Sequence, residues 1–413
     1  MEPHRLLGFA SIAIIMLVVW AWSEDRRNIP WRLVAYSLIT VFVIQVLCLR
    51  VPGASDALLS FSTVAGKANA YAMQGCNFVL TDDVCSGKFL GHDHPVFIFG
   101  IQIFGTIVFI CSICEVGYWS GIVQIIVKGF GFLLQKLGLS GAEAMALGAT
   151  PIMGQIESAL VVRPYVPLLT PSQLFTYMVG SMASTAGGTM ILYIMIGMRP
   201  QWIIAATFSH LFSGIMLAKM KRPDKAIAEG QSASAVELEP SDAHGLFGAI
   251  LTGGLHGVSI GAKVIFAVGL FIAWVFMVQD IFAGITGWFG SSLTLTDALG
   301  YVLTPVAYML GVDWSDLFAS GKIISIGSLT NEVLAMIDFV KSAKAGQLSE
   351  HTQCILTFAI TLFAHPGSIG IQIGGLSAMA PDRKSEITAN AWRAMLVATM
   401  AAWLSASVCS III

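Results

Sequence analysis

The stretch Gly154-Gln155-Ile156-Glu157 places a glycine, an amide and a carboxylate inside a sequence that is otherwise almost entirely apolar. A carboxylate at membrane depth costs at least ~3 kcal/mol, so such a group persists where it faces protein, water or a ligand. Pro151 precedes the stretch and Arg163-Pro164 follows it. We predict a re-entrant hairpin that carries polar groups to a binding site. The alternative is an interfacial helix from which Glu157 reaches the headgroups.

The composition is that of a polytopic membrane protein. Of the 413 residues, 56% are hydrophobic and 11% are charged, and the mean hydropathy is +0.79. A soluble chain would carry about twice this share of charged residues, roughly 25%. The net charge of −2 and the absence of a basic stripe exclude nucleic acid as a partner. We therefore expect an all-α, multi-pass protein of the cytoplasmic (inner) membrane, with the lipid bilayer as its surroundings.

Eight spans are predicted from the apolar runs, and interfacial helices are predicted at residues 57–80 and 117–139. The loop from Glu24 to Arg32 contains three arginines, which mark it as cytoplasmic and place both the N- and C-termini outside. No small-residue cleavage site follows the first span, so we expect it to remain in the protein. The predicted spans cover Leu6–Trp22, Leu33–Cys48, Val96–Glu115, Phe175–Met195, Trp202–Leu217, Val264–Phe282, residues 352 onward, and Ala391–Ile413.

The polar pattern of the first hairpin returns later in the chain. Thr330-Asn331-Glu332 lies at the centre of a second interrupted segment between residues 313 and 340. Two spans also contain helix breakers, Ser184–Thr189 in one and Ala364–Gly370 in the other. Such segments can be unwound and expose backbone carbonyls to a cavity, although small residues at 184–189 are equally consistent with close helix packing.

Each half of the core thus has a hairpin, a broken helix and an intact helix. An odd number of spans separates the two sets, which predicts the inverted repeats of a secondary transporter. We predict that spans 1–3 and one interfacial helix form a scaffold, and that hairpin 1 with spans 4–5 and hairpin 2 with spans 7–8 form two transport repeats. The boundaries are 1–116 for the scaffold, 117–220 for the first repeat, 221–245 for a cytoplasmic linker, 246–298 for scaffold span 6, and 299–413 for the second repeat.

The predicted outer segment contains two features that could carry chemistry. His92, Asp93 and His94 could hold a metal, but no further ligand run accompanies them, so a solvated loop is the better interpretation and no metal is expected. Cys76 and Cys85 both fall on the outer side, where either a disulfide or two free thiols is possible.

Three motifs resemble the concentrative nucleoside transporter family. Residues 154–165, beginning Gly-Gln-Ile-Glu, resemble its Gly-Gln-Thr-Glu hairpin signature. Asn331-Glu332-Val333-Leu334-Ala335 is similar to its Asn-Glu-Phe-Val-Ala run, and residues 363–371 look like its Phe-Ala-Asn-Phe-Ser-Ser-Ile-Gly stretch. The order and spacing match from about residue 5 to the C-terminus.

This resemblance implies a homotrimer whose transport domain moves like an elevator. It implies that the nucleobase side is lined by Gly154, Gln155, Glu157 and Thr189, and that Glu332 and Ser368 hold the ribose hydroxyls, with His365 beside them. It implies a sodium ion between the first hairpin and the unwound fourth span, at Thr150, Met153, Ser184 and Thr185. No cofactor is implied.

Five departures from the family pattern bear on selectivity and coupling. Ile156 replaces a threonine, Thr150 and His365 replace asparagines, and Gly327 replaces a lysine; Pro366 also follows where the family has phenylalanine. Thr150 is a poorer oxygen ligand, whereas position 365 has a histidine, the residue type whose ordinary pKa lies near neutrality. We therefore predict a nucleoside symporter that uses a proton rather than sodium. The alternatives are a sodium-coupled nucleoside symporter and a transporter of a related nucleobase-like solute. The sequence does not decide which nucleosides are carried.

Two other functional classes are possible. An intramembrane enzyme would use Glu332 and His365 as general acid and base, and a channel would give uncoupled flux without saturation. No motif such as His-Glu-x-x-His is present, and inverted hairpins suit alternating access better than chemistry. We therefore expect a transporter and no enzyme.

Overall fold

The apolar runs form helices throughout the part of the chain that the structure describes. This computed structural model describes residues 3–51, 67, 70–85, 99–155, 157–160, 163–224, 243–288 and 294–413, and no strand occurs among them. The N-terminal and hairpin 1 regions contain α1 Pro3–Ala21, α2 Trp31–Arg50, α4 Asp82–Cys85, α5 Phe99–Trp119, α6 Ile122–Lys136, α7 Gly141–Met153 and α8 Glu157–Leu160. The remainder contains α9 Pro171–Ala183, α10 Gly187–Ile196, α11 Pro200–Lys221, α12 Gly245–Trp288, α13 Leu295–Met309, α14 Leu317–Leu329, α15 Glu332–Lys344, α16 Glu350–Ile360, α17 Pro366–Met379 and α18 Lys384–Ile412.

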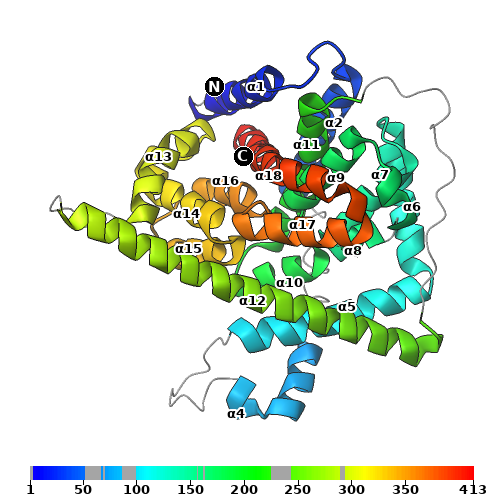
Figure 1. The fold of residues 1–413 in the computed structure, drawn as a ribbon. Coiled ribbons are helices and arrows are strands. Elements are labelled where there is room, and N and C mark those ends of the chain that lie inside the picture. Colours follow the sequence, from blue (N-terminus) through cyan, green and yellow to red (C-terminus); the bar gives the residue numbers. More distant parts are fainter. Residues whose placement is uncertain are drawn as a thin grey trace.

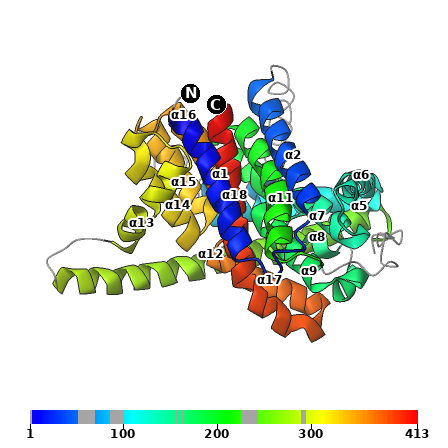
Figure 2. The same cartoon turned by 90° about the horizontal axis from the view of Figure 1, so that it is seen from above.

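The first three predicted spans pack on different helices. α5 lies along the long helix α12 (Figure 1), whereas α1 packs along α18 and α2 packs along α11 (Figure 2). The division of the chain that placed these three spans in one scaffold stays a prediction.

The element order of the two repeats agrees with the prediction. Hairpin 1 consists of α7 and α8, and hairpin 2 of α14 and α15; each is followed by a broken helix and an intact one. A capping box is present at the start of hairpin 1, with Ser140 Oγ accepting from the Glu143 N–H at 3.4 Å. Gly154 turns the chain at the hairpin tip with φ +114°, a conformation that a residue with a Cβ rarely adopts.

The two helix breaks are shorter than the sequence suggested. Break 1 covers residues 184–186 between α9 and α10, and break 2 covers residues 361–365 between α16 and α17. Pro366 therefore starts α17, where its missing N–H needs no partner. Gly187 likewise starts α10, and a Cβ there would lie 3.2 Å from the Ile152 carbonyl. Break 1 thus combines both predicted features, an unwound segment and a close helix contact.

Only some of the predicted spans are single unbroken helices. Among the described residues, three helices are long and apolar enough to cross a membrane, at Trp31–Arg50, Pro200–Lys221 and Pro381–Ile412. The helices α5 and α6 would give a fourth if their 82° bend were within one span. Spans 4 and 7 fall below this length because breaks 1 and 2 divide them.

The loop between α1 and α2 meets the end of α11. Glu24 pairs with Lys221 at 2.9 Å and with Arg222 at 3.1 Å, so two segments predicted to be cytoplasmic do share one side. Lys219, two residues before Lys221 on α11, is buried. Most of the predicted linker, residues 225–242, and the His92–His94 loop lie outside the described residues. Cys76 and Cys85 are both free thiols.

Candidate functional site

Both hairpins and both broken helices contribute to one buried polar cluster. Glu332 begins α15, and its Oε2 lies 3.0 Å from Nε2 of His365, the residue that precedes α17. The same Nε2 lies 3.1 Å from Ser368 Oγ. Tyr193 of α10 donates from its hydroxyl to Glu332 Oε1 at 3.2 Å. Gln155, at the tip of hairpin 1, donates to the Ser368 carbonyl at 3.3 Å. We call these five residues the central polar cluster.

The central polar cluster is buried, unlike the hydrogen-bond networks that are common on protein surfaces. Glu332 is 6% exposed and Gln155 is 7% exposed. A carboxylate this deep requires partners, and here a phenol and an imidazole supply them. Because Gln155 is buried against α17, the tip of hairpin 1 lies inside the protein and not on the membrane surface. The re-entrant interpretation of this stretch is therefore the correct one.

The residue before Glu332 explains how its side chain is positioned. Asn331 precedes α15, and its side-chain oxygen accepts from the Leu334 N–H at 2.9 Å, which starts the helix at Glu332. The carboxylate then stands in the first turn, where the helix dipole favours negative charge. Thr189 lies one helical turn before Tyr193, so it shares that face of α10.

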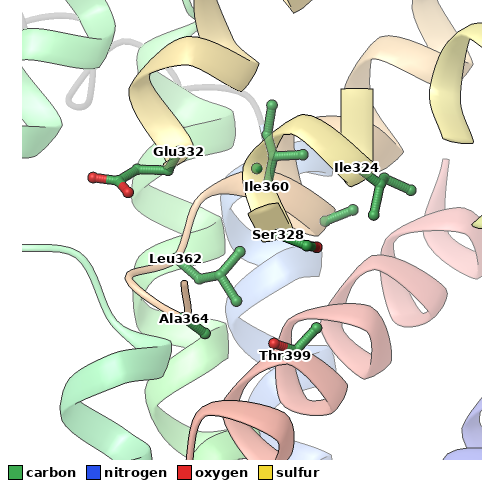
Figure 3. Close-up of a pocket in the computed structure, with 9 residues that line it drawn as sticks. Ile324, Ser328, Glu332, Ile360, Leu362, Ala364 and Thr399 are labelled. Atoms are coloured by element: carbon green, nitrogen blue, oxygen red, sulfur yellow. The ribbon is translucent and has the colours of Figure 1, made fainter. Parts of the chain in front are cut away.

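A small cavity lies behind Glu332. Its volume is about 10 Å³, which is room for roughly one water molecule. Figure 3 shows the Glu332 carboxylate pointing away from Ser328 and Thr399, which line this cavity. Gly327, which stands where the family pattern has a lysine, also lines this cavity. The cavity is too small for a solute.

The residues expected to hold an ion are only partly brought together. Ser184 and Thr185 lie in break 1, and the Ser184 hydroxyl is buried without a hydrogen-bond partner. The Thr150 hydroxyl instead lies 3.0 Å from the Ala146 carbonyl and 3.2 Å from Ser158 Oγ, either of which can accept its one hydrogen. The side chains of Met153 and Glu157 lie outside the described residues.

Three functional-site neighbours were missed by the sequence analysis. Ser158 Oγ lies 2.8 Å from the Tyr177 hydroxyl, which donates to the Gln155 carbonyl at 2.6 Å. These two residues fix the tip of hairpin 1 against α9. Tyr193 could have been predicted from the sequence, because it lies four residues after the predicted site residue Thr189 and so shares a helix face with it. No sequence feature pointed to Tyr177 or Ser158.

Three family models match the chain. One described as "Na+ dependent nucleoside transporter C-terminus" covers residues 202–410, its N-terminal counterpart covers 10–83, and "Nucleoside recognition" covers 100–200. The "Putative nucleoside permease NupX" of Escherichia coli is 30% identical over 403 residues, which are 96% of this chain and 96% of that one.

Solved structures match over nearly the whole chain. CNTnw in an inward-facing, substrate-bound state has a TM-score of 0.88 at 32% identity, covering 99% of this chain and 97% of that one. A variant of CNTnw in an outward-facing state has a TM-score of 0.92 at 32% identity, covering 100% and 99%. The fold is therefore the predicted all-α transporter fold, and elevator-type motion fits the two states.

The family's members are transporters, which excludes the intramembrane enzyme as an interpretation of Glu332 and His365. The motif resemblance is likewise confirmed by matches that extend over nearly the whole length of the relatives. The chain is a membrane protein that belongs to the concentrative nucleoside transporter family.

Proposed function

We propose that the protein takes up nucleosides by ion-coupled symport and that the central polar cluster binds the solute. The supporting observation is the convergence of both hairpins and both broken helices on Glu332, His365 and Gln155. A carboxylate accepts hydrogen bonds from ribose hydroxyls, and an amide both donates to and accepts from a base edge. Glu157, Gly154 and Thr189 complete the base side in this proposal, and Ser368 completes the ribose side.

We further propose the proton as the coupling ion. The Glu332–His365 contact of 3.0 Å places an acid–base pair at the solute site. A second candidate is sodium, favoured by the unpartnered Ser184 hydroxyl in break 1 and by the description of the matching family model.

A gradient experiment tests both the transport and its coupling. Purified protein in liposomes receives radiolabelled uridine, cytidine, adenosine or guanosine, under either an inside-alkaline pH gradient without sodium or a sodium gradient at uniform pH. We expect accumulation under the pH gradient, at about tenfold per pH unit if one proton is coupled. Accumulation under the sodium gradient alone would contradict proton coupling. Failure of all four nucleosides to exchange across the membrane would contradict nucleoside transport.

The packing also supports a revised division of the chain. We propose that α5 and α12 form the static scaffold, and that α1 and α2 travel with the hairpins because they pack on α11 and α18. The homotrimer remains part of the proposal. Large apolar side chains exposed along α12, such as Phe247, Phe266 and Trp288, give it a surface for such contacts. The same proposal keeps the chain in the inner membrane with both termini outside.

Tyr193 is proposed as a positioning residue for Glu332. Its replacement by phenylalanine removes one hydrogen bond to the carboxylate, which is worth about 1–1.5 kcal/mol, or roughly five- to tenfold in affinity. We expect KM for the nucleoside to rise by about that factor while transport at saturation changes little. Tyr308→Phe, on α13 and away from the cluster, is the matched control. An unchanged KM in Tyr193→Phe would show that Glu332 needs no such support.

A further inference from the structure

A second cavity lies apart from the central polar cluster, where four helices begin or end. Its volume is about 190 Å³, well above the roughly 10–15 Å³ that a single water molecule requires. Its walls come from the segment between α10 and α11, the first turn of α11, the last two turns of α15 and the first turn of α16. It shares no lining residue with the central polar cluster. We call it the α11–α15 pocket.

The α11–α15 pocket has an apolar part and a cationic part. The cationic part consists of Arg199 and Lys344. The apolar part consists of four buried side chains, Met198, Trp202, Phe339 and Val340. A cavity with this composition suits an amphiphilic molecule that has an anionic group at one end.

The guanidinium of Arg199 is held in one orientation by the protein. Its Cζ lies 4.3 Å from the centroid of the Trp202 ring, and its Nη1 donates to Glu350. Within the part of the chain that the structure describes, the Nε and Nη2 groups have no hydrogen-bond partner. These two groups form the edge with which a guanidinium binds a phosphate through two parallel hydrogen bonds. Arg199 is therefore oriented and has its phosphate-binding edge unused.

Lys344 gives the pocket an unbalanced positive charge. It is the last residue of α15 and is exposed, and among the described residues it has no ion-pair partner. The charge of Arg199 is balanced by Glu350. Two cations and one anion leave a net charge of +1 for these three side chains. A phosphodiester has a single negative charge and so balances this set.

The pocket lies at one surface of the membrane. α11 is long and apolar enough to span, from Pro200 to Lys221, and its 22 residues extend about 33 Å, close to the roughly 30 Å thickness of the hydrocarbon core. The start of α11 is therefore at the level of the lipid headgroups, on the side opposite to Lys221. Tryptophan is typical of this level, and basic pockets beside spanning helices bind lipid headgroups. This position favours a membrane lipid as the source of the phosphate.

We propose that the α11–α15 pocket binds the phosphodiester headgroup of an anionic phospholipid. The phosphate accepts hydrogen bonds from Arg199 and Lys344, and the adjoining part of the lipid packs on the apolar side chains. α10 carries Tyr193 and α15 carries Glu332 at its other end, so a bound headgroup connects helices that position the central polar cluster. The lipid binds best to the arrangement in which α15 packs beside the start of α11, and it stabilises that arrangement.

The test measures binding to the purified full-length protein in neutral detergent after its lipids have been removed. The probes are phosphatidylglycerol, which is anionic, phosphatidylcholine, which is zwitterionic, and inorganic phosphate. Native mass spectrometry gives the apparent Kd, and thermal unfolding gives the stabilisation. We expect phosphatidylglycerol to bind and to raise Tm, with little effect of the other two probes at the same concentration.

Variants locate the binding in the pocket. Arg199→Gln and Lys344→Gln should each weaken phosphatidylglycerol binding about fivefold or more, because each removes a charge-assisted hydrogen bond. Ala343→Phe keeps both cations but fills the pocket, so it should weaken binding as well. Lys341→Gln is the matched control, since Lys341 is an exposed lysine on α15 that does not line the pocket. Its affinity should equal that of wild type.

The outcomes that contradict the inference are distinct. Wild-type affinity in both Arg199→Gln and Lys344→Gln would overturn it. Equal losses in Lys344→Gln and Lys341→Gln, with none in Ala343→Phe, would indicate attraction to surface charge and would also overturn it. Stabilisation by inorganic phosphate as strong as that by phosphatidylglycerol would replace the lipid with a soluble phosphate. If Arg199→Gln does not fold, Lys344→Gln decides, because this exposed side chain has no ion pair to lose. None of these measurements depends on nucleoside transport.

Discussion

Replacing Glu332 with alanine is expected to abolish measurable nucleoside uptake while the protein remains folded. The substitution removes the proposed acceptor for the ribose hydroxyls and leaves the Tyr193 hydroxyl and the His365 ring without their shared partner. Hydrogen bonds to a charged group are worth about 1.5–3 kcal/mol each, so losing two at the solute corresponds to roughly 10²–10⁴ in transport efficiency. Counterflow of labelled nucleosides in liposomes measures the loss.

Glu332→Gln is the matched variant for this experiment. Glutamine keeps the size of the side chain and one acceptor oxygen but removes the charge, so its uptake should lie between those of wild type and the alanine variant. Gel filtration and thermal unfolding establish that all three proteins are folded and in the same oligomeric state. A twofold loss of uptake corresponds to less free energy than one hydrogen bond contributes. If uptake by Glu332→Ala stayed within about twofold of wild type, the assignment of this carboxylate to the solute site would be refuted.

The sequence was informative where one residue has one physical role. Ser140 and Glu143 have the spacing of a capping box, and a helix begins there. Glu332 follows an asparagine that can cap a helix, and a buried carboxylate at that position requires partners. The hairpin pattern occurs twice, and each copy places a carboxylate, Glu157 or Glu332, within an apolar region. Two carboxylates in equivalent positions of two repeats are explained by one shared binding site, and this indicated the architecture.

The sequence was less informative where the role depends on a distant partner. Pro366 and Gly367 predict a helix break nearby, but proline is tolerated at a first helical position, so the break ends at His365 and Pro366 begins the next helix. Spans 1 and 2 are apolar on most sides, and periodicity alone could not decide whether they cover α12 or α11 and α18.

Lys219 has a structural role that only the fold shows, and replacing it is expected to have the second large effect. Its ammonium lies 2.8 Å from Glu143 and 2.7 Å from Asp224, and the Lys219 and Glu143 side chains are each 1% exposed. This contact ties the first turn of hairpin 1 to the end of α11. Lys219→Met leaves Glu143 buried and without its cation, which is expected to cost about 3–5 kcal/mol of the free energy of unfolding.

Two further variants isolate the ion pair as the cause of that loss. Lys322→Met is the control, because its pair with Asp297 has the same 2.8 Å distance but is 41% and 23% exposed, and should cost at most about 1 kcal/mol. Adding Glu143→Gln to Lys219→Met removes the stranded charge while the amide can still accept from the Ser140 N–H, so most of the lost stability should return. Denaturant titration in detergent measures all four proteins. A cost for Lys219→Met no larger than that of the control, or no recovery in the double variant, would mean that packing around the lysine stem, and not its charge, stabilises the base of hairpin 1.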